Sequence, residues 1–238
     1  MKALIRPWHT VPVVVLMLAG LPACEGMLPG GDELIAEVFL PAVTVVTQGD
    51  GEEYGPELFP ATAGDTWSYF GASQYRRVAV TDRTQSMPGV ETNVWEVDTN
   101  GGEVEHFLRV TSDGVFDYGG LMGRFYAAPV PRLHFPVRVG KSWEMADEAA
   151  HVRVVATVEG TQPVGTARGL FTALRVRYDV ADTDADSPPL VPYARSGGTW
   201  WFVPGLGVVK SKEGSDTFLL RDFAVSGFEE ERQAALLE

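Results

Sequence analysis

The chain has few of the features on which catalytic and metal-binding motifs depend. Its 238 residues include one cysteine, Cys24, so no disulfide can form within the chain and the core has to hold the fold. No G-x-S-x-G elbow, phosphate-binding loop or dinucleotide fingerprint is present. Helical periodicity is almost absent before the C-terminal residues. These absences predict a β-rich, non-enzymatic protein that needs no cofactor.

Basic residues are also scarce. The chain has 19 Lys and Arg against 32 Asp and Glu, which gives a formal net charge of −13. A surface of this sign is repelled by phosphate groups, because like charges raise the free energy of association. Nucleic acid is therefore excluded as the expected partner.

The N-terminus carries the most specific signal in the sequence. Lys2 and Arg6 precede an apolar run at residues 11–21 (VPVVVLMLAGL), and small residues then lead to Cys24. A membrane-spanning helix needs about 20 apolar residues, so the order of positive, apolar and small segments indicates a removable signal peptide. Residues 21–24 (LPAC) resemble the lipobox of bacterial lipoproteins, in which a diacylglycerol is attached to the cysteine before cleavage on its amino side.

This resemblance implies a lipid anchor on Cys24, with palmitate among its acyl chains. Two or more acyl chains hold a protein stably at a bilayer, so the mature protein is expected in the cell envelope. The alternative is an ordinary signal peptide that leaves Cys24 as a free thiol. Glu25 stands where an aspartate is associated with inner-membrane retention in some Gram-negative bacteria, so the outer membrane is favoured there.

Composition divides the precursor into four segments. Residues 1–23 form the signal peptide, and residues 24–33, rich in Gly and Pro, form a tether. Residues 34–227 are expected to form one antiparallel β domain, because all-β domains of this size are commonly single units. Residues 228–238 (FEEERQAALLE) form a tail that favours a short helix, since its acidic residues lie in the first turn.

Alternation of apolar and polar residues predicts strands with one buried and one wet face. It is clearest in four segments, at residues 93–99, 103–111, 151–159 and 174–180, while the apolar residues 34–46 suit a first strand. Ser112-Asp113-Gly114 and Gly101-Gly102 supply turns between such segments, which favours hairpins. The sequence therefore predicts an all-β fold, either an antiparallel β-sandwich or a partly open barrel, with a short C-terminal helix.

One pattern occurs twice along the chain. Residues 59–67 (FPATAGDTW) and residues 135–143 (FPVRVGKSW) share the spacing F-P-x-x-x-G-x-x-W. The proline fixes an extended start, the glycine permits a turn, and the tryptophan begins a strand with a large buried surface. We interpret the two segments as similar corners that precede strands, and a duplicated half-domain would account for the same repetition.

A second motif lies near the C-terminus. Residues 199–210 (TWWFVPGLGVVK) are typical of two strands joined at a Pro-Gly turn. Together with the F-P-x-x-x-G-x-x-W corners, this stretch resembles bacterial envelope proteins and lipoproteins of β-rich fold, loosely over residues 59–225. The resemblance implies compartment and fold, and it brings no catalytic residues.

Four tryptophans are the candidate binding residues: Trp67, Trp143, Trp200 and Trp201. Because Trp200 and Trp201 are consecutive, they point to opposite sides of a strand. If both are buried, the strand is covered on both faces, and this core packing is the favoured interpretation. If one is exposed, it marks a binding surface. In a barrel-like sheet, the inward tryptophan would line a cavity for a lipid or peptide.

Two groups of ionisable residues suggest a metal site only superficially. Asp179, Asp182, Asp184 and Asp186 have the spacing of a calcium loop, but Ser187 and Tyr193 stand where such a loop needs Gly and Glu, so an acidic surface loop is favoured. His106, His134 and His151 are far apart and form no HxH or HExxH pair, so no metal site is predicted.

Glu103, Glu105 and His106 could in principle perform acid–base chemistry. Glu103 and Glu105 lie on one face of a strand and His106 on the other, and charge on a wet strand face is the simpler explanation. A carboxylate pair assembled from distant strands, as in many glycosidases, leaves no sequence pattern.

Three functions are compatible with these residues. The first is a binding or scaffolding module for another envelope component, with a protein as the favoured partner. The second is a carrier or chaperone for a lipid or other apolar ligand. The third is a hydrolase of envelope polymers with a dispersed site. They predict, in turn, an exposed aromatic patch, an enclosed apolar cavity and a polar cleft with close carboxylates.

Overall fold

The computed structural model describes residues 52–87, 89–120, 125–147, 152–183 and 197–228, which belong to one compact unit, Phe39–Glu238. These residues form a 12-stranded antiparallel sheet and one short 3-10 helix, η1 (Pro56–Leu58). The predicted all-β, antiparallel fold is therefore confirmed. Outside the described residues lie Cys24 with its predicted lipid, the signal peptide, the tether, the expected strand at residues 34–46 and, from residue 229 on, the expected C-terminal helix.

The strands fall into two halves of the chain. The first half contains β1 (Thr66–Phe70), β2 (Tyr75–Met87), β3 (Val90–Thr99), β4 (Gly102–Val110), β5 (Gly114–Gly119) and β6 (Phe125–His134). The second half contains β7 (Ser142–Asp147), β8 (Val152–Thr166), β9 (Gly169–Thr183), β10 (Gly198–Val203), β11 (Gly207–Glu213) and β12 (Asp216–Ala224). The four alternating segments coincide with β3, β4, β8 and β9 apart from residue 111, which follows β4, and residue 151, which lies outside the described residues. The Pro204-Gly205 turn joins β10 to β11, as the sequence predicts.

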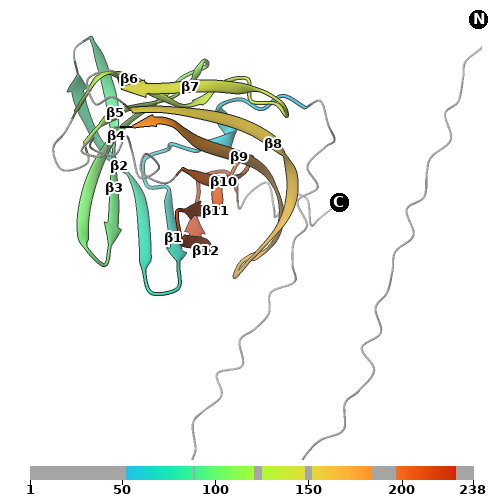
Figure 1. Cartoon of the computed structure of the whole chain (residues 1–238). Coiled ribbons are helices and arrows are strands. Elements are labelled where there is room, and N and C mark those ends of the chain that lie inside the picture. The colour runs from blue at the N-terminus through green and yellow to red at the C-terminus, as the bar shows by residue number, and fades with distance from the viewer. Residues whose placement is uncertain (1–51, 88, 121–124, 148–151, 184–196, 229–238) are drawn as a thin grey trace, which may run out of the picture. The chain divides into compact units, whose positions relative to one another are not determined.

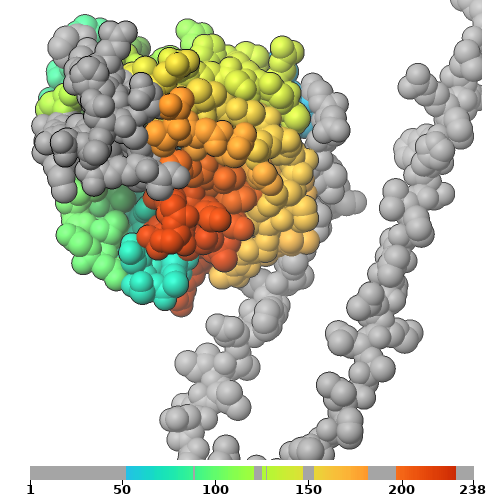
Figure 2. Space-filling model, in the orientation of Figure 1, coloured from blue at the N-terminus to red at the C-terminus, as the bar shows by residue number. Residues whose placement is uncertain are grey.

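Each half is a meander of six strands, and the two meanders meet along one ladder. The order in the sheet is β6-β5-β4-β3-β2-β1-β12-β11-β10-β9-β8-β7. Strands β1 and β12 pair antiparallel, with Trp67 opposite Phe223, so the first and last described strands lie side by side. Figure 2 shows the cyan strands of the first half packed directly beside the red strands of the second.

The sheet curls until its two edge strands, β6 and β7, lie next to each other (Figure 1). No ladder joins them in the described part of the chain, so the sheet stays open. Pro129 and Pro131 lie in β6, and proline has no N–H with which to extend a ladder. The structure thus has one curled, open sheet in place of the two stacked sheets of a sandwich.

Bulges contribute to the curl. On β6, Leu133 pairs with Val115 and Pro131 with Phe116, so Arg132 is an extra residue in that strand. A bulge bends its strand and increases the local twist. Similar register shifts interrupt the β1–β12, β2–β3, β8–β9 and β10–β11 ladders. A long sheet with repeated bulges coils around its concave face, which here becomes the interior.

The two predicted corners share the geometry of their glycine, although Phe135-Pro136 is a cis peptide bond and Phe59-Pro60 is not. Gly64 and Gly140 adopt φ values of 97° and 82°, which only glycine tolerates without strain. The amide of Gly64 donates to the carbonyl of Val80 at 2.8 Å, and the amide of Gly140 donates to that of Val158 at 2.9 Å. Each corner is followed by a buried tryptophan at the start of a strand, as the sequence predicts. The two halves therefore repeat one local design as well as one strand count.

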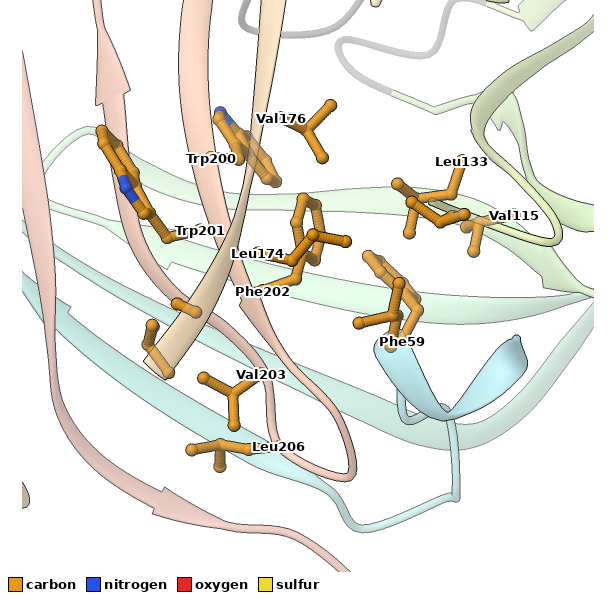
Figure 3. Packing of buried hydrophobic residues seen from close by; sticks show 14 of the residues in the cluster. Phe59, Val115, Leu133, Leu174, Val176, Trp200, Trp201, Phe202, Val203 and Leu206 are labelled. Atoms are coloured by element: carbon orange, nitrogen blue, oxygen red, sulfur yellow. The ribbon is translucent and has the colours of Figure 1, made fainter. Parts of the chain in front are cut away.

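The core fills the concave face of the curled sheet. Strand β10 contributes Phe202 and Val203, which are at most 1% exposed, and the corner after η1 contributes Phe59 from the other end of the chain (Figure 3). Because the core draws on both meanders, each half depends on the other for burial of its apolar face.

Candidate functional site

The concave side of the curled sheet holds a partly open cavity of about 260 Å³. Its wall is built mainly from strands β1 to β4, with contributions from β6, β10 and β11. Successive side chains of a strand point to opposite faces of the sheet, so every second residue faces the cavity. These residues are Trp95, Val97 and Thr99 on β3, and Val104, His106 and Leu108 on β4. The cavity is therefore a product of the same alternation that predicts the strands.

One end of the cavity is deeply buried and the other is partly open. Leu108 and Phe59 at the inner end are 2% and 7% exposed. Val97, Thr99 and Val104, at the ends of β3 and β4, are half-buried. A ligand could therefore reach the cavity from the half-buried end while its other end lies among apolar side chains.

Three aromatic rings fix the inner wall. Trp67 and Trp95 stack with ring centroids 5.8 Å apart and planes 5° from parallel, and Phe59 lies 5.0 Å from Trp95. The indole N–H of Trp67 donates to the carbonyl of Leu206 at 2.7 Å. The indole N–H of Trp95, in contrast, has no hydrogen-bond partner among the described residues, although Trp95 is 4% exposed. A buried donor without an acceptor is costly, so this N–H distinguishes Trp95 from its neighbour.

Arg132, a polar residue of the wall, belongs to a buried ion pair. The bulge in β6 places Arg132 against Asp117 on β5, and the Nε of Arg132 donates to Asp117 at 2.7 Å. The other oxygen of Asp117 accepts the amide of Gly119 at 2.7 Å. Both oxygens of this fully buried carboxylate are thus bonded, which compensates for its loss of water.

His106 extends this pair on the cavity wall. Burial and the neighbouring charge of Arg132 lower the pKa of His106 to about 4. The ring is therefore neutral near pH 7. Its Nδ1 lies 3.4 Å from Nη2 of Arg132, and because arginine can only donate, Nδ1 is the acceptor and Nε2 carries the proton.

A second ion pair lies at the cavity edge. Arg76 donates from both terminal nitrogens to the two carboxylate oxygens of Glu213, at 2.8 and 2.9 Å. Its guanidinium also lies over the ring of Phe218, 4.2 Å from the centroid. Ser211 donates to the same carboxylate at 3.0 Å. Both cationic side chains of the cavity wall, Arg76 and Arg132, are thus neutralised by a carboxylate.

The structure buries all four tryptophans named from the sequence. Trp67 and Trp200 line the cavity. Trp143 packs edge-on against Tyr178, with ring centroids 6.4 Å apart, and Trp201 lies under the ammonium of Lys210 at 4.5 Å. Trp200 and Trp201 are 7% and 6% exposed, so strand β10 is covered on both faces. None of the four forms an exposed aromatic patch.

The ionisable candidates are dispersed. Glu105 forms an exposed ion pair with Arg83 and faces away from His106, as the strand alternation predicts. His134 lies at the exposed end of β6, beside Lys141. Asp179 forms an ion pair with Arg177 at 3.2 Å. His151, Asp184 and Asp186 lie outside the described residues, as does the side chain of Asp182.

Within the described ranges, no group of three or more His, Cys, Asp or Glu could hold a metal ion. A search of the same residues finds no helix with the length and hydropathy to cross a bilayer.

Several wall residues were not singled out from the sequence. Trp95 could have been found, because the alternation in residues 93–99 places it on the same face as Val97. Arg132 and Asp117 leave no such signal, because a bulge and a strand pairing bring them together. Arg76 meets Glu213 across 137 residues, which no local pattern reveals.

Comparison with known proteins gives similarity of fold only. No protein-family model matches the chain, and no curated protein matches it. A solved structure from Bacteroides fragilis, described as an exported protein with a YMCC-like fold, is 12% identical and covers 73% of this chain and 100% of its own, with a TM-score of 0.44. A lipoprotein structure from Parabacteroides distasonis is 13% identical over 70% of this chain and 98% of its own, with a TM-score of 0.36. Neither assigns a function to this chain.

Proposed function

We propose that this protein is a lipid-anchored component of the bacterial cell envelope that carries an apolar ligand inside its curled sheet. The anchor rests on the signal-peptide pattern and the LPAC segment that ends at Cys24. The carrier function rests on the cavity, whose wall is mainly aromatic and aliphatic. Enclosed, mostly apolar cavities with a few polar groups are typical of small-molecule binding sites.

The size of the cavity limits the ligand. An engineered cavity of about 150 Å³ takes up benzene, so one of about 260 Å³ has room for about ten carbon atoms. This corresponds to a medium-length acyl chain or to the end of a longer one.

The polar groups of the wall and their ion-pair partners favour binding over hydrolysis. Asp117 and Glu213 are each bound to an arginine, so neither is placed as a free general acid or base. His106 has a neutral ring held through Nδ1 by Arg132, and no nucleophile among the described residues lies in hydrogen-bond contact with it. We therefore propose a non-enzymatic role.

The carrier function is tested by native mass spectrometry of the full-length chain. The protein would be purified from the source envelope in polymer nanodiscs, so that no detergent competes for the cavity, and extracted with organic solvent. A stoichiometric, non-covalent apolar molecule is expected. An empty chain would overturn the carrier function. In parallel, incorporation of labelled palmitate into the wild type but not into Cys24→Ser would support the anchor.

A second function, docking of an envelope protein, is favoured by one observation. Phe70 on β1 and Leu219 on β12 are directly paired across the ladder and are 45% and 38% exposed. Arg221 lies over Phe70 at 4.6 Å. Crosslinking from Phe70→Cys in the intact envelope should capture a partner, whereas Ser112→Cys in the β4–β5 turn should not.

A further inference from the structure

Two neighbouring side chains on the cavity wall carry N–H donors that form no hydrogen bond within the described residues, and the donor of Trp95 is itself buried. Trp95 and His106 are direct partners in the β3–β4 ladder, so their side chains leave the sheet next to each other on the same face. They are 4% and 8% exposed. The Nε1 of Trp95 and the Nε2 of His106 form no hydrogen bond within the described residues.

Other polar side chains on the same wall do have partners. The hydroxyl of Tyr69 donates to the carbonyl of Val208 at 3.0 Å, and that of Thr99 donates to the carbonyl of Gly102 at 3.2 Å. Arg76 and Arg132 are bound to carboxylates. Because native interiors leave few polar groups unbonded, the buried N–H of Trp95, next to the unbonded N–H of His106, points to an acceptor supplied from outside the chain.

We infer that the cavity recognises an uncharged acyl compound, an ester or amide, whose carbonyl oxygen accepts hydrogen bonds from Trp95 and His106 while its chain lies along the apolar wall. This inference rests on the proposed carrier function. It identifies the polar group of the ligand, which the apolar wall does not specify.

The charge of the wall favours an uncharged acceptor over a carboxylate. Each arginine of the wall is already paired with a carboxylate, and His106 is neutral near pH 7. A ligand carboxylate would therefore enter an apolar cavity whose described cations are already compensated, and its lost hydration would not be replaced. An ester or amide carbonyl loses much less on leaving water, and two N–H groups replace the hydrogen bonds that it made there.

The orientation of Trp95 suits this role. Its ring stacks against that of Trp67, at a centroid distance of 5.8 Å, and contacts that of Phe59, at 5.0 Å. The N–H is thus fixed before a ligand arrives. A preorganised donor binds more tightly than a mobile one, because no side-chain entropy is lost on binding.

The test compares three probes of matched length on the full-length chain: methyl octanoate, decane and octanoate. Binding is followed by tryptophan fluorescence and by calorimetry at pH 7. We expect methyl octanoate to bind about tenfold more tightly than decane and than octanoate, because of its hydrogen-bonded, uncharged carbonyl. This comparison uses only the wild type, so it does not depend on the folding of a variant.

Variants then locate the donor. Trp95→Phe removes the N–H and keeps an aromatic ring. It should lower the affinity for methyl octanoate about tenfold and change the affinity for decane by less than about twofold. Trp201→Phe is the matched control. It also removes a buried N–H that has no acceptor among the described residues, but Trp201 does not line the cavity. This variant should leave the affinity for both probes unchanged.

The outcomes separate the two proposals. If decane and methyl octanoate bind equally and Trp95→Phe changes neither, the donors are satisfied by water, and the inference fails while the carrier function stands. Tighter binding of octanoate would also overturn the inference, because it requires an uncharged carbonyl. If no probe binds, the carrier function itself fails.

Discussion

Trp143 donates its indole N–H to the carbonyl of Pro131 at 3.0 Å, and this hydrogen bond joins the two edge strands of the sheet. A second side chain, Tyr178, donates its hydroxyl to the carbonyl of Arg132 at 3.2 Å. Main-chain ladders join all other neighbouring strands, whereas β6 and β7 meet through side chains. We call this junction of β6 with the second half of the chain, through Trp143 of β7 and Tyr178 of β9, the seam.

The hydrogen bond from Trp143 across the seam should contribute measurably to the free energy of unfolding. Trp143→Phe removes the donor and leaves the partly buried carbonyl of Pro131 without it, so we expect the free energy of unfolding to fall by about 1–2 kcal/mol. Urea unfolding of the full-length chain measures this. The control is Trp201→Phe, whose indole N–H has no acceptor to lose among the described residues. Equal losses in the two variants would show that the bond adds nothing to stability.

The buried ion pair should contribute more than an exposed one. Asp117→Ala removes the carboxylate from Arg132, whose side chain is only 10% exposed, and should cost about 3–5 kcal/mol because the buried guanidinium loses its counter-charge. Glu144→Ala removes the partner of Arg153 from an exposed pair and should cost less than about 1 kcal/mol. Chemical denaturation compares the two. A loss below about 1 kcal/mol for Asp117→Ala would contradict the expectation.

His106 should make stability depend on pH. Its pKa is about 4 in the folded chain against 6.5 unfolded, so the unfolded chain takes up the proton first as the pH falls. The contribution of the neutral ring is complete above pH 6.5 and is lost progressively toward pH 4, by at most about 3 kcal/mol.

The contribution of His106 to the pH dependence of stability is isolated by comparing a variant with the wild type. His106→Gln should flatten the stability profile between pH 6.5 and pH 4 relative to the wild type. Thermal melts across this range provide the measurement. Parallel profiles for the wild type and His106→Gln would show that His106 does not titrate below its ordinary range.

Filling the cavity should abolish ligand binding without unfolding the chain. Val97 is half-buried at the open end of the cavity, so Val97→Trp can extend its ring into the space that a ligand would occupy. We expect a loss of at least about tenfold in affinity for methyl octanoate, with the free energy of unfolding changed by less than about 1 kcal/mol. Leu170→Trp, at a position 41% exposed on β9, is the control and should bind as the wild type does.

The strands and the two corners were predictable because their signals are local. Alternation along residues 93–99 depends only on which face of one strand is buried, and the φ of Gly64 depends only on its own turn. The curl was not predictable, because the bulge at Arg132 appears only when β6 pairs with β5. The cavity depends on the curl, so the sequence supports it only as one of three alternatives, beside an exposed aromatic patch and a polar cleft.

The placement of the tryptophans was likewise predictable only in part. Sequence alone placed Trp200 and Trp201 on opposite faces of a strand, and the structure shows both faces covered. It did not select Trp95 as a site residue, because a tryptophan in an alternating strand is most simply a core residue. Only the missing acceptor, together with His106 across the ladder, distinguishes Trp95 from other buried tryptophans.

The unequal junctions between the two meanders have a mechanical consequence. Along β1 and β12 the halves are joined by main-chain hydrogen bonds, whereas at the seam they are held by contacts such as the Trp143 and Tyr178 bonds. Separation at the seam breaks side-chain contacts and leaves the ladders of the described strands intact, while separation at β1 and β12 would break a ladder. We therefore expect the two halves to separate first along the proline-bearing edge of β6, while the β1–β12 ladder keeps them joined.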